Sequence, residues 1–429
     1  MKNLFSISLI IGLMLFMTNC LNAGTNNPDT KTTITPDADN AGLKLPDGFN
    51  ALIVANDIGR SRHIAVTNQG EVYVKLNRAV NGKGILLLTD EDGDGRADKQ
   101  IGFGNYGGTG IYLTNDYLYA SSNSTVYRYK LDKNQHAVNP DNAEVVVKDL
   151  IDRRQHNSKS ITLDDGGYIY INIGAYSNAC QQRDRTKGSP GIQPCPVLDS
   201  AGGIWRFKAD GLNQTYGDGI RFATGLRNVV GLDWNKETNQ LFVMMHGRDQ
   251  LHDLFPDLYD TKTSAELPAE TMYALKNGDN CGWPYMYYDQ IQHKKILGPE
   301  YGGDGKIEYD GDAIDPVLAF PGHLAPNALL FYTGDMFPAK YHNGAFIAFH
   351  GSWNRAPEVQ EGFYVVFAPF KDGKSTGEWE VFADNFAGVD KIVSPGDAKH
   401  RPCGLAQGPD GSLYVSDDVK GTIYRIMYK

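Results

Sequence analysis

Five short polar segments of the chain carry the side chains that could do chemistry. Each lies at the edge of an alternating hydrophobic run, and they span residues 153–158, 225–232, 246–249, 350–355 and 401–404. An imidazole titrates near neutral pH and suits proton transfer, whereas a guanidinium is a fixed cation. Each segment alone is a weak signal, so its meaning depends on the fold that brings the segments together.

A second group of candidate residues is acidic. Residues 90–98 read DEDGDGRAD, which places carboxylates at positions 1, 3, 5 and 9 of an EF-hand-like loop, namely Asp90, Asp92, Asp94 and Asp98. This spacing directs oxygens toward one point, as calcium requires. Position 12 is Ile101 instead of glutamate, and no helical pattern flanks the loop. We expect a structural calcium ion here, with a solvated acidic turn as the alternative; neither is catalytic.

Short strands are the elements that must position these segments. A turn followed by an alternating aromatic strand recurs six times, over residues 70–74, 116–120, 167–171, 240–243, 344–348 and 411–415. Period-2 alternation bounded by Gly, Asp and Asn is typical of half-buried antiparallel strands. Six copies over roughly 385 residues give about 64 residues per unit, more than a compact propeller blade needs.

The repeat predicts an all-β fold, a six-bladed β-propeller with long inter-strand loops. The longest insertion is expected at about residues 253–321. A propeller closes its sheets radially, which protects many edge strands, and its usual site is the mouth of the central channel. A pair of β-sandwiches is the alternative, although its strands would not repeat one phrase at blade-like intervals.

Composition excludes some classes of protein. The 429 residues include 51 Asp+Glu and 41 Lys+Arg, for a formal charge of -10. Such a chain has no global positive field to attract nucleic acid, so nucleic acid is not expected as a partner. Hydrophobic residues make up 41% and charged residues 21%, which excludes wholesale disorder.

The N-terminus predicts an export signal. Lys2 precedes an apolar run over residues 4–17, too short for a bilayer core that needs about 20 residues. Residues 17–20 read MTNC and resemble the lipobox of bacterial lipoproteins, in which the cysteine, here Cys20, becomes lipidated. Cleavage near Ala23, giving a soluble periplasmic protein, is the alternative. We expect a signal peptide over 1–20, a flexible linker over 21–44 and the propeller over 45–429.

The predicted location is therefore the periplasm or the outer membrane, with membrane contact only through a lipid anchor at Cys20. Four further cysteines follow in the chain: Cys180, Cys195, Cys281 and Cys403. The first two could close a short loop and leave the others as a second pair, but four cysteines allow three pairings and the choice stays open. The sequence contains no haem-attachment motif and no zinc-binding spacing.

The order of the polar segments, with the phrases between them, resembles the glucose/sorbosone dehydrogenase family. Its members are soluble quinoproteins that use pyrroloquinoline quinone (PQQ). The most specific stretches are 225–231, 282–284, 350–355 and 401–418, and residues 177–180 favour the sorbosone-like branch. The resemblance implies a six-bladed propeller that oxidises an aldose or related sugar hydroxyl or aldehyde. Hydride would pass to the quinone, and electrons would leave to an external acceptor, a quinone or a cytochrome.

The resemblance also assigns roles by position. His156 matches the general base, and Arg227 matches the cation that faces the quinone carbonyl. Three residues match cofactor-binding positions: Asn228, Arg355 and Arg401. The backbone carbonyls of Gly247 and Arg248 match ligands of a calcium ion that touches the cofactor.

Two residues depart from the family pattern. Ala175 stands where the glucose branch has an aspartate near the base, so another group must orient His156. Thr109 lies in a phrase that often reads Pro-His-Gly. These departures keep a non-catalytic carbohydrate- or partner-binding propeller as an alternative. A calcium-dependent sugar-lactone hydrolase is a further alternative, but it needs carboxylates in the channel, and the polar loops offer Arg and His.

Overall fold

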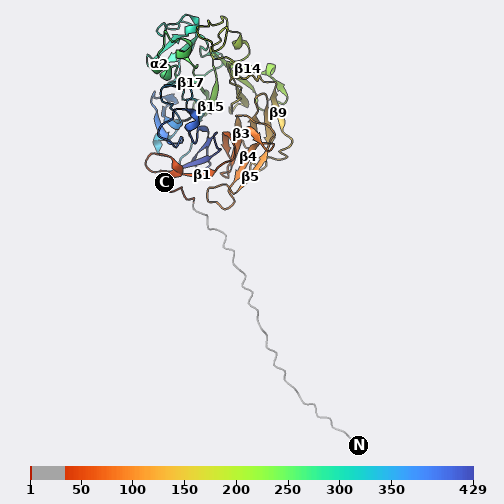
Figure 1. Ribbon diagram of the computed structural model, residues 1–429. Helices are drawn as coiled ribbons and strands as arrows, with labels where there is room; N and C mark the ends of the chain where they lie inside the picture. The colour runs from red at the N-terminus through yellow and green to blue at the C-terminus, as the bar shows by residue number, and fades with distance from the viewer. Residues whose placement is uncertain (2–33) are drawn as a thin grey trace.

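A computed structural model describes Met1 and residues 34–429. Six mainly antiparallel sheets surround a central axis (Figure 1), so the predicted six-bladed β-propeller is confirmed. The expected signal peptide, Cys20 and most of the expected linker lie outside the described residues. Within the described part of the chain, no helix has the length and apolar character needed to cross a membrane.

The blades follow one another along the chain. Blade 1 contains β2 (Ser61–Val66), β3 (Val72–Val80), β4 (Lys83–Thr89) and β5 (Lys99–Phe103). Blade 2 contains β6 (Ile111–Leu113), β7 (Tyr117–Ser121), β8 (Val126–Lys130), β9 (Glu144–Lys148) and β13 (Gln214–Thr215). Blade 3 contains β10 (Ile161–Leu163), β11 (Tyr168–Ile173), β12 (Gly203–Lys208), β14 (Ile220–Thr224) and β18 (Asp279–Asn280).

The second half of the ring has the same plan. Blade 4 contains β15 (Val229–Asn235), β16 (Gln240–Met245), β17 (Glu270–Leu275) and β21 (Leu318–Phe320). Blade 5 contains β22 (Pro326–Phe331), β23 (Ala345–Phe349), β24 (Tyr364–Ala368) and β27 (Glu380–Ala383). Blade 6 contains β28 (Pro402–Gln407), β29 (Leu413–Asp417), β30 (Ile423–Tyr428) and β1 (Phe49–Ala55).

The ring is closed by pairing the two ends of the folded chain. Strand β1 runs antiparallel to β30, with Phe49 opposite Tyr428 and Ile53 opposite Tyr424. Around the axis, each innermost strand contacts the next, in the order β2, β6, β10, β15, β22, β28 and back to β2. Closure of this kind removes the free edges that open sheets leave exposed.

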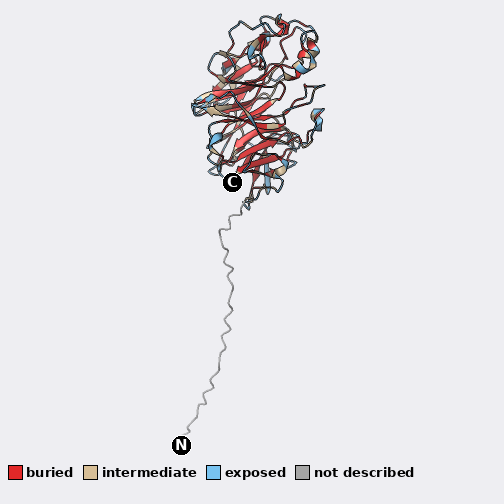
Figure 2. Cartoon of the chain, turned by 90° about the vertical axis from the view of Figure 1, so that its left-hand side faces the viewer, coloured by how far each residue is buried: buried red, intermediate tan, exposed pale blue. Residues whose placement is uncertain are grey.

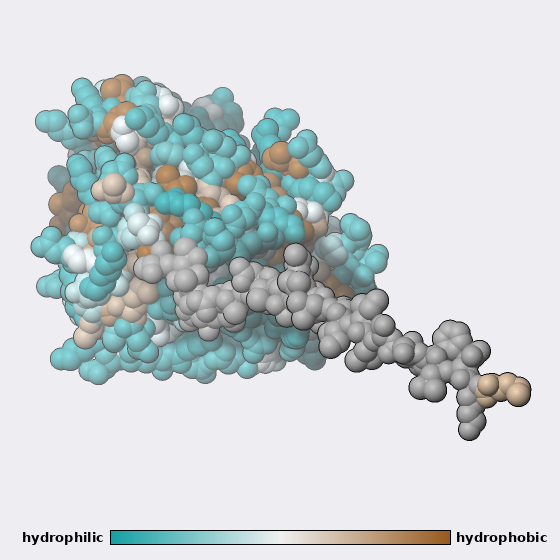
Figure 3. Space-filling view, turned by 90° about the horizontal axis from the view of Figure 1, so that it is seen from below, coloured by the Kyte–Doolittle hydropathy of each residue, from teal (hydrophilic) through white to brown (hydrophobic). Residues whose placement is uncertain are grey.

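The phrase that recurs in the sequence is the second strand of every blade: β3, β7, β11, β16, β23 and β29. This strand lies between two neighbours and packs against the adjacent blades, so its residues are almost all buried, as in β23. Figure 2 shows the buried residues concentrated in the strands. Hydrophilic residues cover most of the face seen in Figure 3, with small hydrophobic patches between them.

The predicted long insertion is divided in two by strand β17. The first part joins β16 to β17 and contains α1 (Leu251–Leu254) and α2 (Thr261–Glu266). The second part joins β17 to β21 and contains the hairpin of β19 (Met286–Asp289) and β20 (Lys294–Leu297). A small hairpin of β25 (Phe370–Lys371) and β26 (Lys374–Ser375) extends blade 5.

Six short 3-10 helices occur in the connections of the described chain. They are η1 (Asn40–Gly42), η2 (Pro196–Asp199), η3 (Tyr216–Asp218), η4 (Pro299–Tyr301), η5 (Ala339–Tyr341) and η6 (Pro395–Asp397). Helix η1 falls within the expected linker, yet residues 34–44 pack on the propeller. Leu43 is buried in the core cluster shared by blades 5 and 6, and Lys44 pairs with Asp384. The folded body therefore begins before residue 45.

One of the two possible disulfides forms. Cys180 and Cys195 are bonded and close a loop between β11 and β12. The second possible disulfide does not form, because Cys281 and Cys403 are buried free thiols. Cys281 packs in the cluster between blades 3 and 4, whereas Cys403 belongs to β28 in blade 6.

Candidate active site

A cavity of about 240 Å³ opens where the loops of blades 3, 4 and 5 meet at one end of the innermost strands. Four of the five polar segments reach it, those around His156, Arg227, Gly247 and Trp353. The other polar side chains that line it are Gln155, Arg185, His246, Asp249, Glu270, His323 and Asn354, and Trp353 lies at its edge with 55% exposure. The sequence prediction that separate loops converge on one pocket holds for these residues.

His156 lies just before β10 in a left-handed backbone conformation, with φ of 51°. Non-glycine residues seldom adopt this region, and such residues cluster at functional sites. Nδ1 donates a hydrogen bond to the Ala175 carbonyl at 2.5 Å. A carbonyl only accepts, so Nε2 carries no hydrogen in the neutral ring and is the basic nitrogen. Gly174 is required beside it, because a Cβ there would lie 2.6 Å from the His156 Cβ.

Burial and the nearby positive charge of Arg227 lower the pKa of His156 to about 3. The imidazole is therefore neutral near pH 7 and able to accept a proton at Nε2. His246, which also lines the cavity, has its pKa lowered to about 3 for the same two reasons. Its Nε2 is 3.1 Å from the Pro326 carbonyl and donates to it. Of these two histidines, only His156 has an Nε2 atom that is free to accept a proton.

Arg227 is buried beside His156 and is held by four hydrogen bonds. It donates to the Asn178 carbonyl at 3.2 Å, the Asn178 side-chain oxygen at 3.0 Å, Asp249 at 2.6 Å and the Gly247 carbonyl at 2.8 Å. A guanidinium has five N–H groups, so one Nη1 hydrogen is left for a ligand. Asn178 is itself fixed, because Trp283 donates to its carbonyl at 3.0 Å.

Asp249 balances the positive charge of the site. It accepts from Arg227 at 2.6 Å and from Arg185 at 2.8 Å. Burial alone would raise the pKa of this carboxyl, but the two guanidinium groups outweigh burial and hold the pKa well below its usual range. Asp249 is thus ionised, and it fixes the direction in which both arginines point.

Glu270, the first residue of β17, is the second carboxyl group of the cavity. It accepts hydrogen bonds from the backbone N–H groups of Gly247 at 3.0 Å and Ala325 at 3.2 Å. Burial raises its pKa to about 8, against the opposing effect of these two bonds. The group is therefore largely protonated at neutral pH and supplies little negative charge.

The three predicted cofactor-binding residues do not line this cavity. Asn228 follows Arg227 in the chain, and its Oδ1 accepts from Asn172 at 3.4 Å. Arg355 donates to the Ala265 carbonyl and to Glu266, both at 2.6 Å. Arg401 donates to the His350 carbonyl at 2.9 Å and the Gly351 carbonyl at 2.5 Å. Arg355 and Arg401 thus hold loops together, and their role toward a cofactor stays a prediction.

The predicted calcium ligands near the cavity have other partners in the protein. Gly247 lines the cavity, but its carbonyl accepts from Arg227. The Arg248 side chain turns away and forms a buried ion pair with both oxygens of Glu300, at 2.7 and 2.9 Å. A calcium ion at the Gly247 carbonyl would have to share it with the guanidinium.

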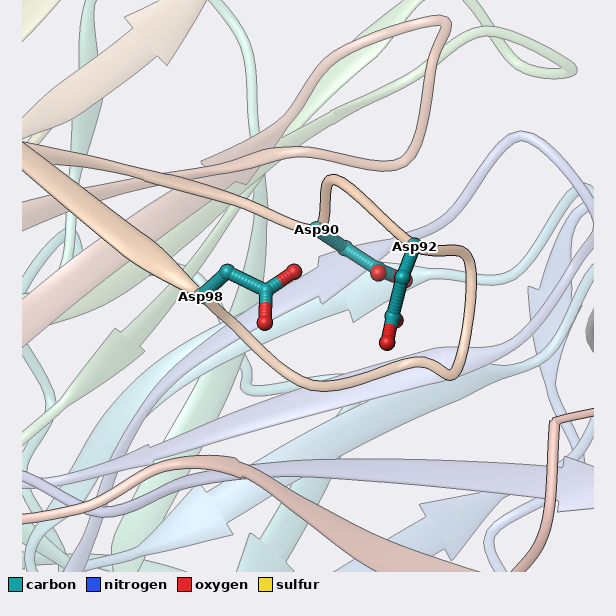
Figure 4. A group of neighbouring side chains, drawn as sticks. All are labelled: Asp90, Asp92 and Asp98. Atoms are coloured by element: carbon teal, nitrogen blue, oxygen red, sulfur yellow. The ribbon is translucent and has the colours of Figure 1, made fainter.

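The acidic loop forms the turn between β4 and β5, at the outer edge of blade 1. Figure 4 shows the side chains of Asp90, Asp92 and Asp98 around this turn, and each offers an oxygen within 4.8 Å of the other two. Asp94 is not part of this group and instead accepts from the Arg96 backbone at 2.8 Å. The structure thus brings three of the four predicted aspartates together.

The family model described as TrAA12-like matches residues 43–291 and 306–429. The chain belongs to this family. The "Pyrroloquinoline quinone-dependent sugar dehydrogenase" of Hypocrea jecorina is 22% identical over 408 residues, which cover 88% of this chain and 87% of that protein. The corresponding "pyranose dehydrogenase" of Coprinopsis cinerea is 26% identical over 277 residues, 56% of this chain and 36% of that protein. A Borreliella burgdorferi protein is 29% identical over 208 residues, 48% of each chain.

Solved structures share the fold of this TrAA12-like chain. The calcium structure of Trichoderma reesei family AA12 has a TM-score of 0.73 at 18% identity and covers 90% of this chain and 97% of that one. The holo form of the PQQ domain of the Coprinopsis cinerea pyranose dehydrogenase has a TM-score of 0.68 at 19% identity, with the same coverage. The chain spans less than half the length of the Coprinopsis and Borreliella proteins it matches.

The donors in the cavity fit a ligand rich in acceptor oxygens. Besides the Nη1 hydrogen of Arg227, Arg185 uses three of its five N–H groups on Gln155, Gln250 and Asp249. The Nδ2 atom of Asn354 is buried and has no hydrogen-bond partner among the described residues. A buried donor without a partner costs about 1–3 kcal/mol, so a polar ligand or water is expected there. A planar quinone with several carboxylates fits this donor set.

Sequence reasoning missed Arg185, Glu270 and His323 as members of the site. Arg185 lies in the loop that the Cys180–Cys195 bridge closes, and Glu270 begins a regular strand. One sequence signal could have indicated Glu270: it is an acidic residue at the start of an otherwise apolar strand. Two carboxyl groups, Asp249 and Glu270, do line the cavity beside the arginines and histidines. Even so, the only metal-ligating group of three in the described chain is the one at Asp90.

Proposed function

We propose that this TrAA12-like protein is a PQQ- and calcium-dependent dehydrogenase. It oxidises an aldose or a related sugar hydroxyl or aldehyde, and the electrons leave to an external acceptor, a quinone or a cytochrome. The observation that carries the proposal is the neutral His156 with an unprotonated Nε2, fixed beside the Arg227 guanidinium in one cavity. A base next to a cation is what removal of a hydroxyl proton with loss of a C–H hydride requires.

When bound, PQQ supplies an electrophilic carbonyl that takes up the hydride from the substrate carbon. The His156 Nε2 accepts the hydroxyl proton at the same time, so the C–H electron pair and the proton leave in different directions. The Ala175 carbonyl holds the imidazole in the tautomer that this step needs. Arg227, aimed by Asp249 and Asn178, stabilises negative charge that develops on an oxygen in the cavity.

Arg185 and Arg227 would hold the negatively charged groups of the cofactor, and Asn354 would donate to one of its oxygens or to the sugar. Calcium would act as a Lewis acid at the Gly247 and Arg248 carbonyls, and a second ion would bind at Asp90, Asp92 and Asp98. The residues for these cofactor and calcium assignments follow from the family resemblance and from the donor set of the cavity.

We also propose that the chain is exported and held at the outer membrane by a lipid on Cys20.

The decisive experiment compares the wild-type protein with His156→Asn. Asparagine tolerates the left-handed backbone, and its Nδ2 can donate to the Ala175 carbonyl, so the fold and the hydrogen bond are retained while the base is lost. We expect sugar-dependent dye reduction, in the presence of PQQ and calcium, to fall at least about 100-fold. PQQ binding, followed by its absorbance, should stay within about threefold.

His136→Asn is the matched control, since this histidine is half-exposed on blade 2 and bonds only to Glu71 through its ring. It should leave turnover unchanged. Equal turnover in His156→Asn and the wild type would reject the assigned base. PQQ binding without oxidation of any sugar would favour the binding propeller, and lactone hydrolysis without PQQ would favour the hydrolase.

A further inference from the structure

A second cavity, of about 210 Å³, adjoins the one that contains His156. Two consecutive residues, Trp353 and Asn354, line both cavities and therefore form the boundary between them. The second cavity is otherwise formed by the insertion of blade 4, with residues from α1 and α2, and by Arg355. Its volume is below that of pockets for drug-sized ligands, so it suits a single small ring.

Trp353 has the features of a stacking platform. It follows β23 in the loop over residues 350–363, and it is 55% exposed, whereas Trp205 and Trp283 are each 4% exposed. Nothing in the described chain stacks on its ring. A large aromatic face at the edge of two polar cavities is suited to the C–H face of a pyranose.

Asn354 adds hydrogen-bonding capacity at the same boundary. Its Nδ2 is buried and lacks a hydrogen-bond partner in the described part of the chain. Buried polar atoms of this kind are rare, and each calls for a partner. The carboxamide both donates and accepts, as recognition of a sugar hydroxyl requires.

The rest of the second cavity is polar without a strong net charge. His252 donates through Nδ1 to the Tyr259 carbonyl at 2.7 Å. Asp253 is exposed at its edge, and the Arg355 charge is balanced by Glu266 at 2.6 Å. Such a lining favours a neutral ligand with hydroxyl groups over an anion, in contrast to the arginines of the first cavity.

We propose that the second cavity binds the second sugar ring of a disaccharide or longer glycan, while the ring that is oxidised lies at His156. Trp353 stacks on the sugar, and Asn354 hydrogen-bonds a hydroxyl near the linkage. The proposal rests on the proposed function, since it assigns the substrate class to the same site. It adds that the natural substrate is longer than a monosaccharide.

The test uses the full-length protein loaded with PQQ and calcium, with glucose, maltose, cellobiose and lactose as probes. For the disaccharide with the highest kcat/KM, Trp353→Ala should lower kcat/KM at least 10-fold. The loss for glucose should be at least fivefold smaller, because glucose meets Trp353 only where this residue borders the first cavity. Trp353→Phe keeps an aromatic face, so it should retain most of the wild-type kcat/KM for the disaccharide. Ile291→Ala, at an exposed residue (62%) on the β19–β20 hairpin, should change neither value.

Direct binding separates this proposal from the proposed function. Titration calorimetry of the protein without PQQ should show binding of that disaccharide that is at least 10-fold weaker in Trp353→Ala. An equal loss for glucose and the disaccharide would overturn the second subsite, as would equal disaccharide affinity in the two proteins. If the loaded wild-type protein oxidised no sugar, the proposed function would fail, and calorimetry would decide the sugar subsite by itself.

Discussion

The Nδ1 atom of His156 lies 2.5 Å from the backbone carbonyl of Ala175 and donates its hydrogen to it. Alanine at position 175 brings no carboxylate, yet its main chain performs the orienting task that a carboxylate side chain would otherwise perform. The Ala175 N–H in turn donates to the Arg227 carbonyl at 2.8 Å. One peptide segment therefore connects the predicted base to the predicted cation.

The first prediction concerns the pH dependence of sugar oxidation. Burial and the neighbouring Arg227 lower the pKa of His156 to about 3, so the imidazole is unprotonated throughout the range from pH 5 to 8. We expect kcat/KM to show no loss through the ordinary histidine pKa of about 6.5. A pH–rate profile with a dye acceptor checks this, and a protonation step near 6.5 that disappears in His156→Asn would contradict it.

The second prediction concerns acid stability. Burial lowers the pKa of His63, in the central channel, to about 4. Between that value and about 6.5 the unfolded chain binds the extra proton, so folding stability must fall as the pH falls. Each such histidine contributes a slope of about 1.4 kcal/mol per pH unit.

Urea unfolding at pH 7, 6 and 5 measures that slope. The neutral variant His63→Gln should reduce it by about 1.4 kcal/mol per pH unit, because Gln has no proton to gain. His293→Asn, at an exposed position in the turn between β19 and β20, should leave it unchanged. A slope that is the same in the wild type and His63→Gln would refute the assignment.

The sequence pattern was sufficient for the architecture because every blade needs the same buried second strand. Strands β3, β11 and β29 are buried over most of their length instead of half-buried, because each packs between two neighbouring strands and two adjacent blades. This shared burial selects the same β-branched and aromatic residues in every blade. Strand count and closure could therefore be predicted without any family knowledge. The division of the long insertion by β17 was missed, because β17 lies inside a region without the recurring phrase.

The site was harder to predict for a different reason. His156, Arg227 and Gly247 belong to segments with distinctive order, and they do meet in one cavity. Glu270 and His323 belong to no recognisable motif, so the sequence offers at most the acidic first residue of an apolar strand for Glu270 and no signal for His323. Arg355 and Arg401 match positions in the chain but do not line this cavity, because a matching position does not fix where a long side chain points. Their cofactor role stays a prediction.

The third prediction tests the charge balance of the cavity. Asp249→Asn removes the carboxylate that both Arg227 and Arg185 contact, and it leaves the buried Arg227 charge uncompensated. Breaking a buried pair in this way costs about 3–5 kcal/mol, so unfolding free energy should fall by about that amount. Glu144→Gln is the control, because its pair with Arg128 at 2.6 Å involves a carboxylate that is 44% exposed.

The control should lose less than about 1 kcal/mol, as expected for a pair open to water. Chemical denaturation at pH 7 measures both changes. A loss in Asp249→Asn no larger than that in Glu144→Gln would show that the cavity does not depend on this carboxylate for its charge balance.

The last prediction concerns calcium at the turn between β4 and β5. The oxygens of Asp90, Asp92 and Asp98 converge within 4.8 Å, whereas Asp94 is bonded to the Arg96 backbone. Without a cation these carboxylates repel one another, so millimolar calcium should raise the melting temperature. Asp98→Asn should lose most of this increase, whereas Asp94→Asn should keep it. Because a second ion at the cavity would also stabilise the fold, an increase that survives in Asp98→Asn would assign the effect to the cavity and refute calcium binding at this turn.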